Sequence, residues 1–160
     1  METFLNDKEI LDLLSELKTM TVFPEDLIRS MKSKRGHSES EHIIQRPDGS
    51  TFHIRLRLSN ENPMDFSVIL GFCPAKATKL FLLRRYNGKS HEHKNKLESE
   101  VPFYDYHIHT ATERYQKEGT KEECFAEVTD RYTTIQEALK CLIKDCNVIL
   151  PQRQQTSLDL

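Results

Sequence analysis

Two His-x-His pairs are the chemically most reactive feature of this 160-residue sequence. His91 and His93 form the first pair, and His107 and His109 form the second. On a β-strand, side chains two residues apart project from the same face, about 6.5–7 Å from each other. Histidine titrates near pH 6.5 and also binds transition metals through a neutral ring nitrogen. Each pair is therefore a candidate for proton transfer or for metal binding.

The second pair lies in a stretch of alternating polar and apolar residues from Phe103 to Arg114, which predicts a strand. On such a strand Asp105 and Glu113 share a face with both histidines. One interpretation is metal-free cleavage of RNA, in which His107 and His109 act as general base and general acid. Arg114 and Tyr115, which follow directly, would supply a positive charge for the phosphorane and a hydroxyl group.

A second interpretation is a metal-dependent hydrolase, in which histidines of both pairs hold zinc together with a carboxylate. Its ligands would come from His91, His93, His107 and His109, although the sequence names no certain third ligand. A third interpretation is structural, with His107 and His109 forming hydrogen bonds across neighbouring strands. The sequence does not place the two pairs close together, so all three interpretations stand.

The formal charge of −2 conceals two basic blocks. Residues 28–57 hold seven bases and three acids, and residues 76–96 hold seven bases and one acid. Such blocks could attract a polyanion such as RNA if the fold brings them together. The candidate nucleic-acid-binding residues are His53, Arg55, Arg57, Arg84, Arg85 and Lys89.

Helices and strands are expected in separate groups, which favours an α+β domain with an antiparallel sheet. We expect about five strands, with two N-terminal helices and one C-terminal helix packed on them. Residues 1–150 should form this single domain and residues 151–160 a flexible tail. Helices are predicted at residues 7–19, from Pro24 onward and at residues 135–147. A hairpin is predicted from strands 38–46 and 51–58 around the turn Pro47–Ser50. Further strands are predicted at 66–72, 78–86 and 103–114, and a loop at 89–102.

Several classes of protein are excluded by composition. The apolar runs are too short for a membrane helix, and the acidic start does not resemble a signal peptide, so we expect a cytoplasmic protein. Four scattered cysteines without a CxxC pair predict reduced thiols. No P-loop or dinucleotide motif is present, and no cofactor is expected.

The segment from Arg85 to His93, RYNGKSHEH, is followed by an aromatic-rich strand and a helix with the pattern Ile135, Ala138-Leu139, Leu142-Ile143 and Asp145. Over residues 80–147 this arrangement resembles a family of small uncharacterised bacterial proteins and is distantly similar to the TumE-type toxins of toxin–antitoxin operons. By that resemblance, His91 and His93 match the His-x-His of the toxins. The resemblance implies a small bacterial α+β protein that acts on RNA or pairs with a partner protein.

Taken together, the sequence favours a toxin-like endoribonuclease with histidine acid–base catalysis. A non-catalytic module that binds a partner protein, such as an antitoxin or a phage or defence component, is the alternative from another class. A metal-dependent hydrolase is the third hypothesis. RNA and a partner protein are the expected partners, and the sequence does not define the oligomeric state.

Overall fold

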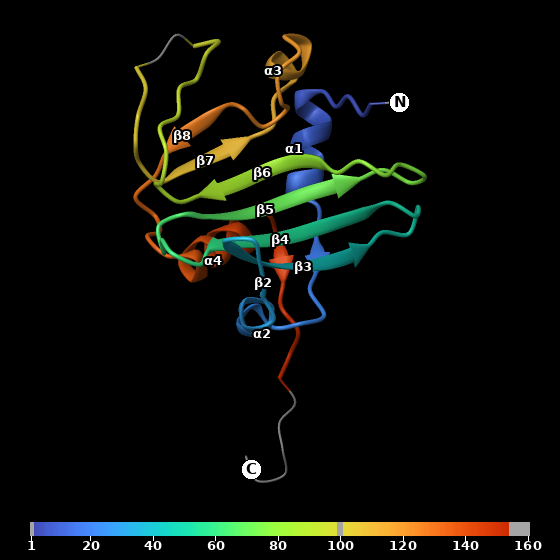
Figure 1. Cartoon of the computed structure of the whole chain (residues 1–160). Coiled ribbons are helices and arrows are strands. Elements are labelled where there is room, and N and C mark those ends of the chain that lie inside the picture. The colour runs from blue at the N-terminus through green and yellow to red at the C-terminus, as the bar shows by residue number, and fades with distance from the viewer. Residues whose placement is uncertain (1, 99–100, 154–160) are drawn as a thin grey trace.

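The computed structural model describes residues 2–98 and 101–153. Its centre is a seven-stranded antiparallel sheet in which the strands follow one another in chain order (Figure 1). A separate pair of short parallel strands joins β1 (Lys18–Thr19) to β9 (Val148–Ile149). The strands of the large sheet are β2 (Lys32–Lys34), β3 (His37–Gln45), β4 (Thr51–Ser59), β5 (Phe66–Cys73), β6 (Phe81–Asn87), β7 (His107–Thr110) and β8 (Ala126–Val128).

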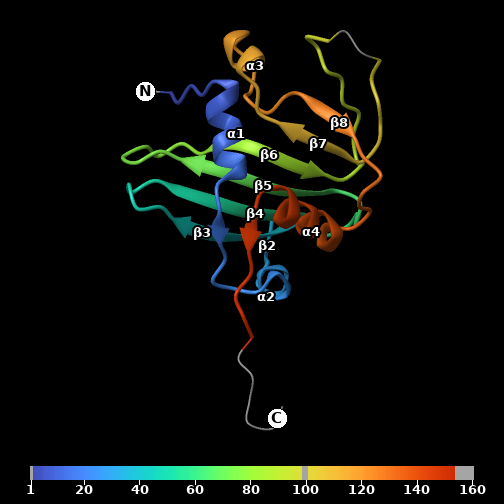
Figure 2. The same ribbon diagram turned by 180° about the vertical axis from the view of Figure 1, so that it is seen from behind.

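Helices α1 (Asp7–Ser15), α2 (Pro24–Arg29) and α4 (Ile135–Asp145) lie on one face of this sheet (Figure 2). Asn6 and Glu9 form the predicted capping box of α1, which satisfies N–H groups that the first turn leaves free. The α+β class, the antiparallel sheet and all three predicted helices are therefore confirmed.

Strand β4 shows how the sequence separates the two faces. Phe52, Ile54 and Leu56 are at most 1% exposed and point to the helices. The alternating residues His53, Arg55 and Arg57 point to the opposite face, which we call the open face. Pairing continues this face across the sheet, because Arg55 is opposite Ile69, Ile69 is opposite Arg85, and Arg85 is opposite His109.

The sheet has more strands than the five expected. The sequence analysis assigned no strand to the basic stretch 32–36, but Lys32–Lys34 pairs with β3 through a turn at Gly36, whose φ of +79° suits glycine. Strand β8 was also missed, because three residues give too short a pattern to detect.

Two predicted elements are shorter in the structure. Helix α1 ends at Ser15 rather than at residue 19, because Lys18 and Thr19 form β1. The strand predicted at 103–114 keeps only His107–Thr110, since Thr112 caps the short helix α3 (Glu113–Lys117). Arg114 and Tyr115 are consequently helical. Residues 154–160 of the predicted tail lie outside the described residues.

None of the helices in the described ranges is both long and apolar enough to cross a membrane.

Candidate metal centre

A long connection between β6 and β7 brings the two His-x-His pairs together (Figure 1). The connection is closed near its middle by two backbone hydrogen bonds between His93 and Phe103, of 2.9 and 2.8 Å. His93 then lies against the second pair, with ring centroids 5.4 Å from His107 and 4.7 Å from His109. The distance between the pairs, which the sequence left open, is therefore short.

Three of the four histidines converge. One ring nitrogen from each of His93, His107 and His109 lies within 4.8 Å of the other two. Tetrahedral zinc with Zn–N bonds of about 2.0–2.1 Å needs nitrogens about 3.4 Å apart, so the widest pair must close by about 1.4 Å. His93 lies on a connection rather than in a strand, and a change in its side-chain torsions supplies movement of this size.

The backbone orients both histidines of β7. Nδ1 of His107 lies 2.7 Å from the backbone oxygen of Asp105, and Nδ1 of His109 lies 2.8 Å from that of Glu123. A carbonyl oxygen only accepts hydrogen bonds, so each Nδ1 carries the proton and each neutral ring keeps a lone pair on Nε2. Nε2 of His107 is buried without a hydrogen-bond partner among the described residues. Histidine ligands of metals are commonly fixed by this kind of carbonyl partner.

Asn95 orients the third histidine. Its Oδ1 accepts a hydrogen bond from the backbone N–H of Ala126 at 2.8 Å, and its Nδ2 donates to the Ala126 oxygen at 2.6 Å. These bonds fix which end of the amide is oxygen, so Nε2 of His93, 3.0 Å from Oδ1, is the donor. Nδ1 of His93 is then the nitrogen with a lone pair.

An ion pair flanks the histidines. Arg85 contacts the carboxylate of Glu123 at 3.1 Å, and its Nη2 donates to Nε2 of His109 at 3.4 Å. Glu123 is 1% exposed, and neither of its carboxylate oxygens has a hydrogen-bond partner among the described residues. A metal on Nε2 of His109 would replace the hydrogen bond from Arg85, whose charge Glu123 would still balance.

Burial makes the histidines of β7 poor proton donors. His107 and His109 are 0% and 2% exposed. Burial lowers the pKa of His107 to about 4 and that of His109 to about 2, and the charge of Arg85 acts in the same direction on both. Both rings are thus neutral near pH 7. A neutral imidazole binds metals but has no acidic proton to give to a leaving group.

The other two predicted catalytic residues lie elsewhere. Tyr115 is 2% exposed and donates a hydrogen bond to Glu98 at 2.6 Å, while Arg114 forms an ion pair with the same carboxylate at 2.9 Å. Both residues therefore hold the connection between β6 and β7 against α3. Their contacts are with Glu98 rather than with the histidines.

The predicted nucleic-acid-binding residues do not form one surface. His53 and Arg55 both contact Glu41 on the open face, and Lys89 lies 5.5 Å from the centre of the Tyr106 ring. Arg84 points to the helix-covered face, because adjacent residues of a strand project in opposite directions. Arg85 lies beside the histidines, as described above.

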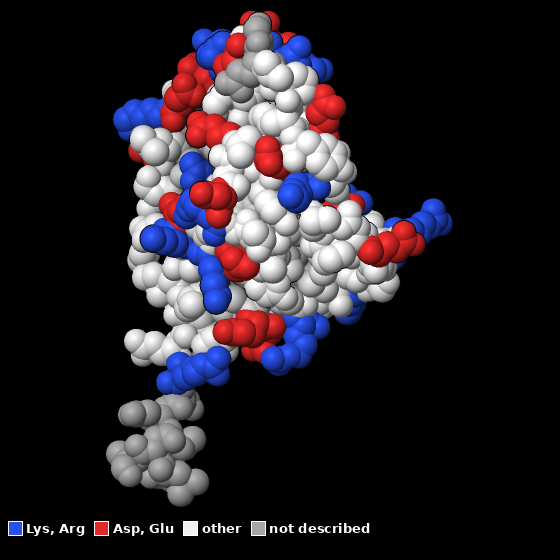
Figure 3. All heavy atoms as spheres, turned by 90° about the vertical axis from the view of Figure 1, so that its left-hand side faces the viewer, with Lys and Arg blue, Asp and Glu red and all other residues white. Residues whose placement is uncertain are grey.

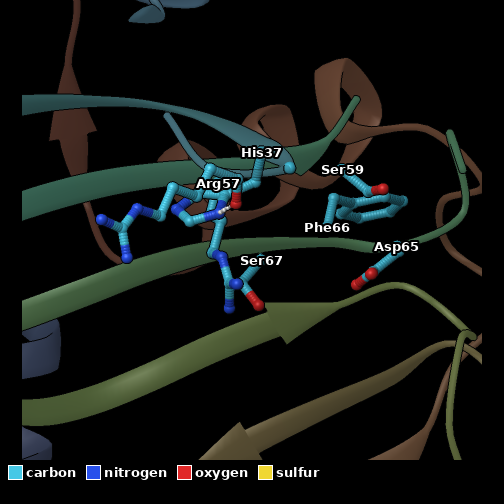
Figure 4. A pocket seen from close by; sticks show the side chains of 8 residues that line it. His37, Arg57, Ser59, Asp65, Phe66 and Ser67 are labelled. Atoms are coloured by element: carbon cyan, nitrogen blue, oxygen red, sulfur yellow. Dashed lines mark hydrogen bonds between the residues drawn. The ribbon is translucent and has the colours of Figure 1, made fainter. Parts of the chain in front are cut away.

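Arg57 lines a small pocket of about 110 Å³ on the open face (Figure 4). His37 and Ser67 lie at the same end of this pocket, and Asp65 lies toward the other end (Figure 4). Arg57 has no ion pair in the part of the chain that the structure describes.

Two residues of the site escaped the sequence analysis. Glu123 was not among the candidate residues, yet it is buried beside Arg85; an acidic side chain in the polar stretch around it would be expected on the solvated surface. Asn95 was not singled out at all. Its only signal in the sequence is a position two residues after His93, in a stretch without periodicity.

Comparisons of the chain with protein-family models, with curated proteins and with solved structures found no match.

Proposed function

We propose that this protein is a metal-dependent hydrolase with a divalent ion, in the first place Zn²⁺, bound by His93, His107 and His109. One observation carries the proposal: one ring nitrogen from each of the three histidines lies within 4.8 Å of the other two. The second nitrogen of each ring is already bound to a carbonyl oxygen. Imidazole ligands suit zinc, copper, iron and nickel. Zinc prefers four ligands in a tetrahedral arrangement, and the three histidines would occupy three of these positions.

Three protein ligands leave one position of a tetrahedral zinc ion for water. Zinc supplies the nucleophile by lowering the pKa of that water toward neutrality. Arg85 is placed to stabilise negative charge that develops on the substrate, because its Nη2 already lies 3.4 Å from a ligand nitrogen. Glu123 holds Arg85 in this position through their ion pair.

The acid–base mechanism predicted for RNA cleavage has less support. It requires one of His107 and His109 to carry a transferable proton, whereas burial keeps both rings neutral. RNA remains the first substrate to test, because Arg57, which has no ion pair among the described residues, lies on the face that carries the histidines.

A second candidate function is a structural zinc site. The ring of His91 lies 5.7 Å from that of His107, and the side chain is exposed on the same connection as His93. If His91 became a fourth ligand, the coordination shell would be closed, and the ion would fasten the connection between β6 and β7 to the sheet.

The test combines metal removal with a hydrolysis assay. Metal-free protein is supplied with Zn²⁺, with Mn²⁺ or with EDTA, and is assayed on single-stranded RNA and on bis(p-nitrophenyl) phosphate. We expect turnover only with metal, and its loss in His107→Gln but not in the matched variant His42→Gln on β3. Cleavage of RNA that persists in EDTA would support acid–base catalysis instead. Stoichiometric zinc without turnover of either substrate would support the structural site.

A further inference from the structure

A second pocket, of about 350 Å³, lies on the other face of the strands that carry the histidines. Strand β7 contributes to both sites, because Ile108 and Thr110 alternate with His107 and His109. The C-terminal end of α4 closes one side of the pocket through Asp145. Figure 3 shows basic and acidic side chains interspersed on one side of the molecule, around a broad area of other residues. This pocket is separate from the proposed metal centre and does not depend on it.

Arg84 is the unusual residue of this pocket. It is opposite Leu70 on one side and Thr110 on the other, on the face that elsewhere forms the hydrophobic core. Its Nε is buried without a hydrogen-bond partner, and Arg84 forms no ion pair within residues 2–98 and 101–153. Burial of an unpaired charge opposes folding, and an unsatisfied buried donor calls for a functional explanation.

The partly buried acid of this pocket, Asp145, acts electrostatically on Arg84 but is shared with a second arginine. Asp145 receives two hydrogen bonds from Arg131, at 2.7 and 2.8 Å, in the bidentate geometry that arginine favours with carboxylates. The hydroxyl of Tyr86 donates to the same carboxylate at 2.7 Å. One partly buried carboxylate therefore serves two guanidinium groups on the wall of this cavity, which leaves room for a second anion beside Arg84.

We propose that this pocket binds a small molecule through a carboxylate or phosphate group that Arg84 and Thr110 hold. Thr110 lines the pocket beside Arg84, and a guanidinium matches the oxygens of both kinds of anion. The volume is within the range of small-molecule sites. Glu127 also lines the pocket and is exposed, so the site favours a singly charged anion or a zwitterion over a polyanion.

The proposal is tested by NMR titration of ¹⁵N-labelled, metal-free protein with inorganic phosphate and, separately, with acetate. The Nε–Hε signal of Arg84 and the amide of Thr110 are followed, with sodium chloride as the control for ionic strength. We expect saturable shifts at these two groups, and Arg84→Met should lose them while Arg57→Met, in the pocket of the open face, keeps them. Saturation by only one probe identifies the anion class. Shifts no larger than those caused by chloride, or equal binding by Arg84→Met, would overturn the proposal.

A melting measurement and one further variant guard against a failure to fold. Arg84→Met replaces a half-buried charge, which has no ion pair among the described residues, with an apolar chain, so its melting temperature should equal or exceed that of the wild type. Glu127→Gln changes only an exposed residue and should bind phosphate severalfold more tightly, because it removes a like charge from the pocket wall. Unchanged or weaker phosphate binding by Glu127→Gln would contradict the proposed site. Neither readout involves zinc, so these results are independent of the proposed hydrolase activity.

Discussion

The ring of His93 stacks on the ring of His107, with centroids 5.4 Å apart and planes inclined by 17°. One ring belongs to the connection after β6 and the other to strand β7, so the contact depends on how the connection folds back over the sheet. A metal ion bound by both would fasten the connection in this position. Metal binding should therefore be coupled to the ordering of the connection between β6 and β7.

The first prediction concerns the ligands themselves. Replacing His93 or His107 with glutamine should weaken Zn²⁺ binding by at least ~100-fold, since loss of a ligand exceeds the effect of losing its hydrogen-bond partner. Isothermal titration of metal-free protein measures the affinity, and His42→Gln serves as the control. Equal affinities in His107→Gln and wild type would place the metal elsewhere.

The second prediction concerns Asn95, which positions His93 without being a ligand. Asn95→Ala should weaken Zn²⁺ binding by about 10–100-fold. It should also lower the free energy of unfolding by about 1–3 kcal/mol, because the backbone groups of Ala126 lose their partners. The matched control is Asn60→Ala, which removes an exposed asparagine far from the histidines in the sequence. A change in stability with no change in metal affinity would show that Asn95 has no part in positioning His93.

The third prediction is a loss of stability in acid. The pKa of His107 is about 4 in the folded protein and about 6.5 when unfolded, so the unfolded state binds more protons between these values. Stability should fall as the pH decreases from about 6.5 to 4, by roughly 3 kcal/mol for this group. Denaturant unfolding of metal-free protein measures the slope, which should be shallower in His107→Gln. Identical slopes would mean that His107 is not buried as a neutral ring.

The fourth prediction concerns Lys18 at the junction of α1 and β1. Its ammonium is buried and donates to the backbone oxygens of Leu14, Glu16 and Cys146. Burial lowers its pKa from 10.5 to about 8, so the unfolded state binds more protons between these values. The free energy of unfolding should therefore gain a contribution from this group as the pH rises from about 8 to 10.5. The difference between wild type and Lys18→Met isolates this contribution, and parallel pH profiles would contradict it.

The fifth prediction separates the metal mechanism from acid–base cleavage of RNA. Arg114→Ala removes an exposed ion pair with Glu98, which contributes about 0–1 kcal/mol, and should leave zinc affinity and turnover unchanged. Arg85→Gln should lower turnover instead, because Arg85 borders a ligand nitrogen. The opposite ranking of these two variants would favour the role that the sequence suggested for Arg114.

Local patterns predicted much of the fold. The turn at Pro47–Ser50, the capping box of α1, the N-cap residue Thr134 of α4 and the alternation in β4 each arise within a few residues, and all four are present. At α4 the carboxylate of Glu137 contacts the Thr134 hydroxyl, so the full capping box expected there is not formed. Short elements such as β2 and β8 were missed because three residues carry too little periodicity. β2 pairs with β3 through a tight turn, and β8 pairs with β7, so the place of each in the sheet is set by its partner strand rather than by its own sequence.

The candidate site was only partly predictable. The His-x-His spacing indicated that His107 and His109 share a face, which the pairing of β7 supports. The burial of Glu123 and the two bonds from Asn95 to Ala126 depend on how two long segments cross the open face, and no local pattern encodes that path. Arg84 and Arg85 look equivalent in the sequence, yet the period of two in a strand sends them to opposite faces of the sheet.

Zinc K-edge X-ray absorption on protein loaded with one equivalent of Zn²⁺ tests the central claim most directly. The account predicts four-coordinate zinc with three imidazole nitrogens at about 2.0–2.1 Å and one oxygen ligand, and the loss of one imidazole in His93→Gln. A zinc ion surrounded mainly by oxygen, or bound by fewer than two imidazoles, would contradict it.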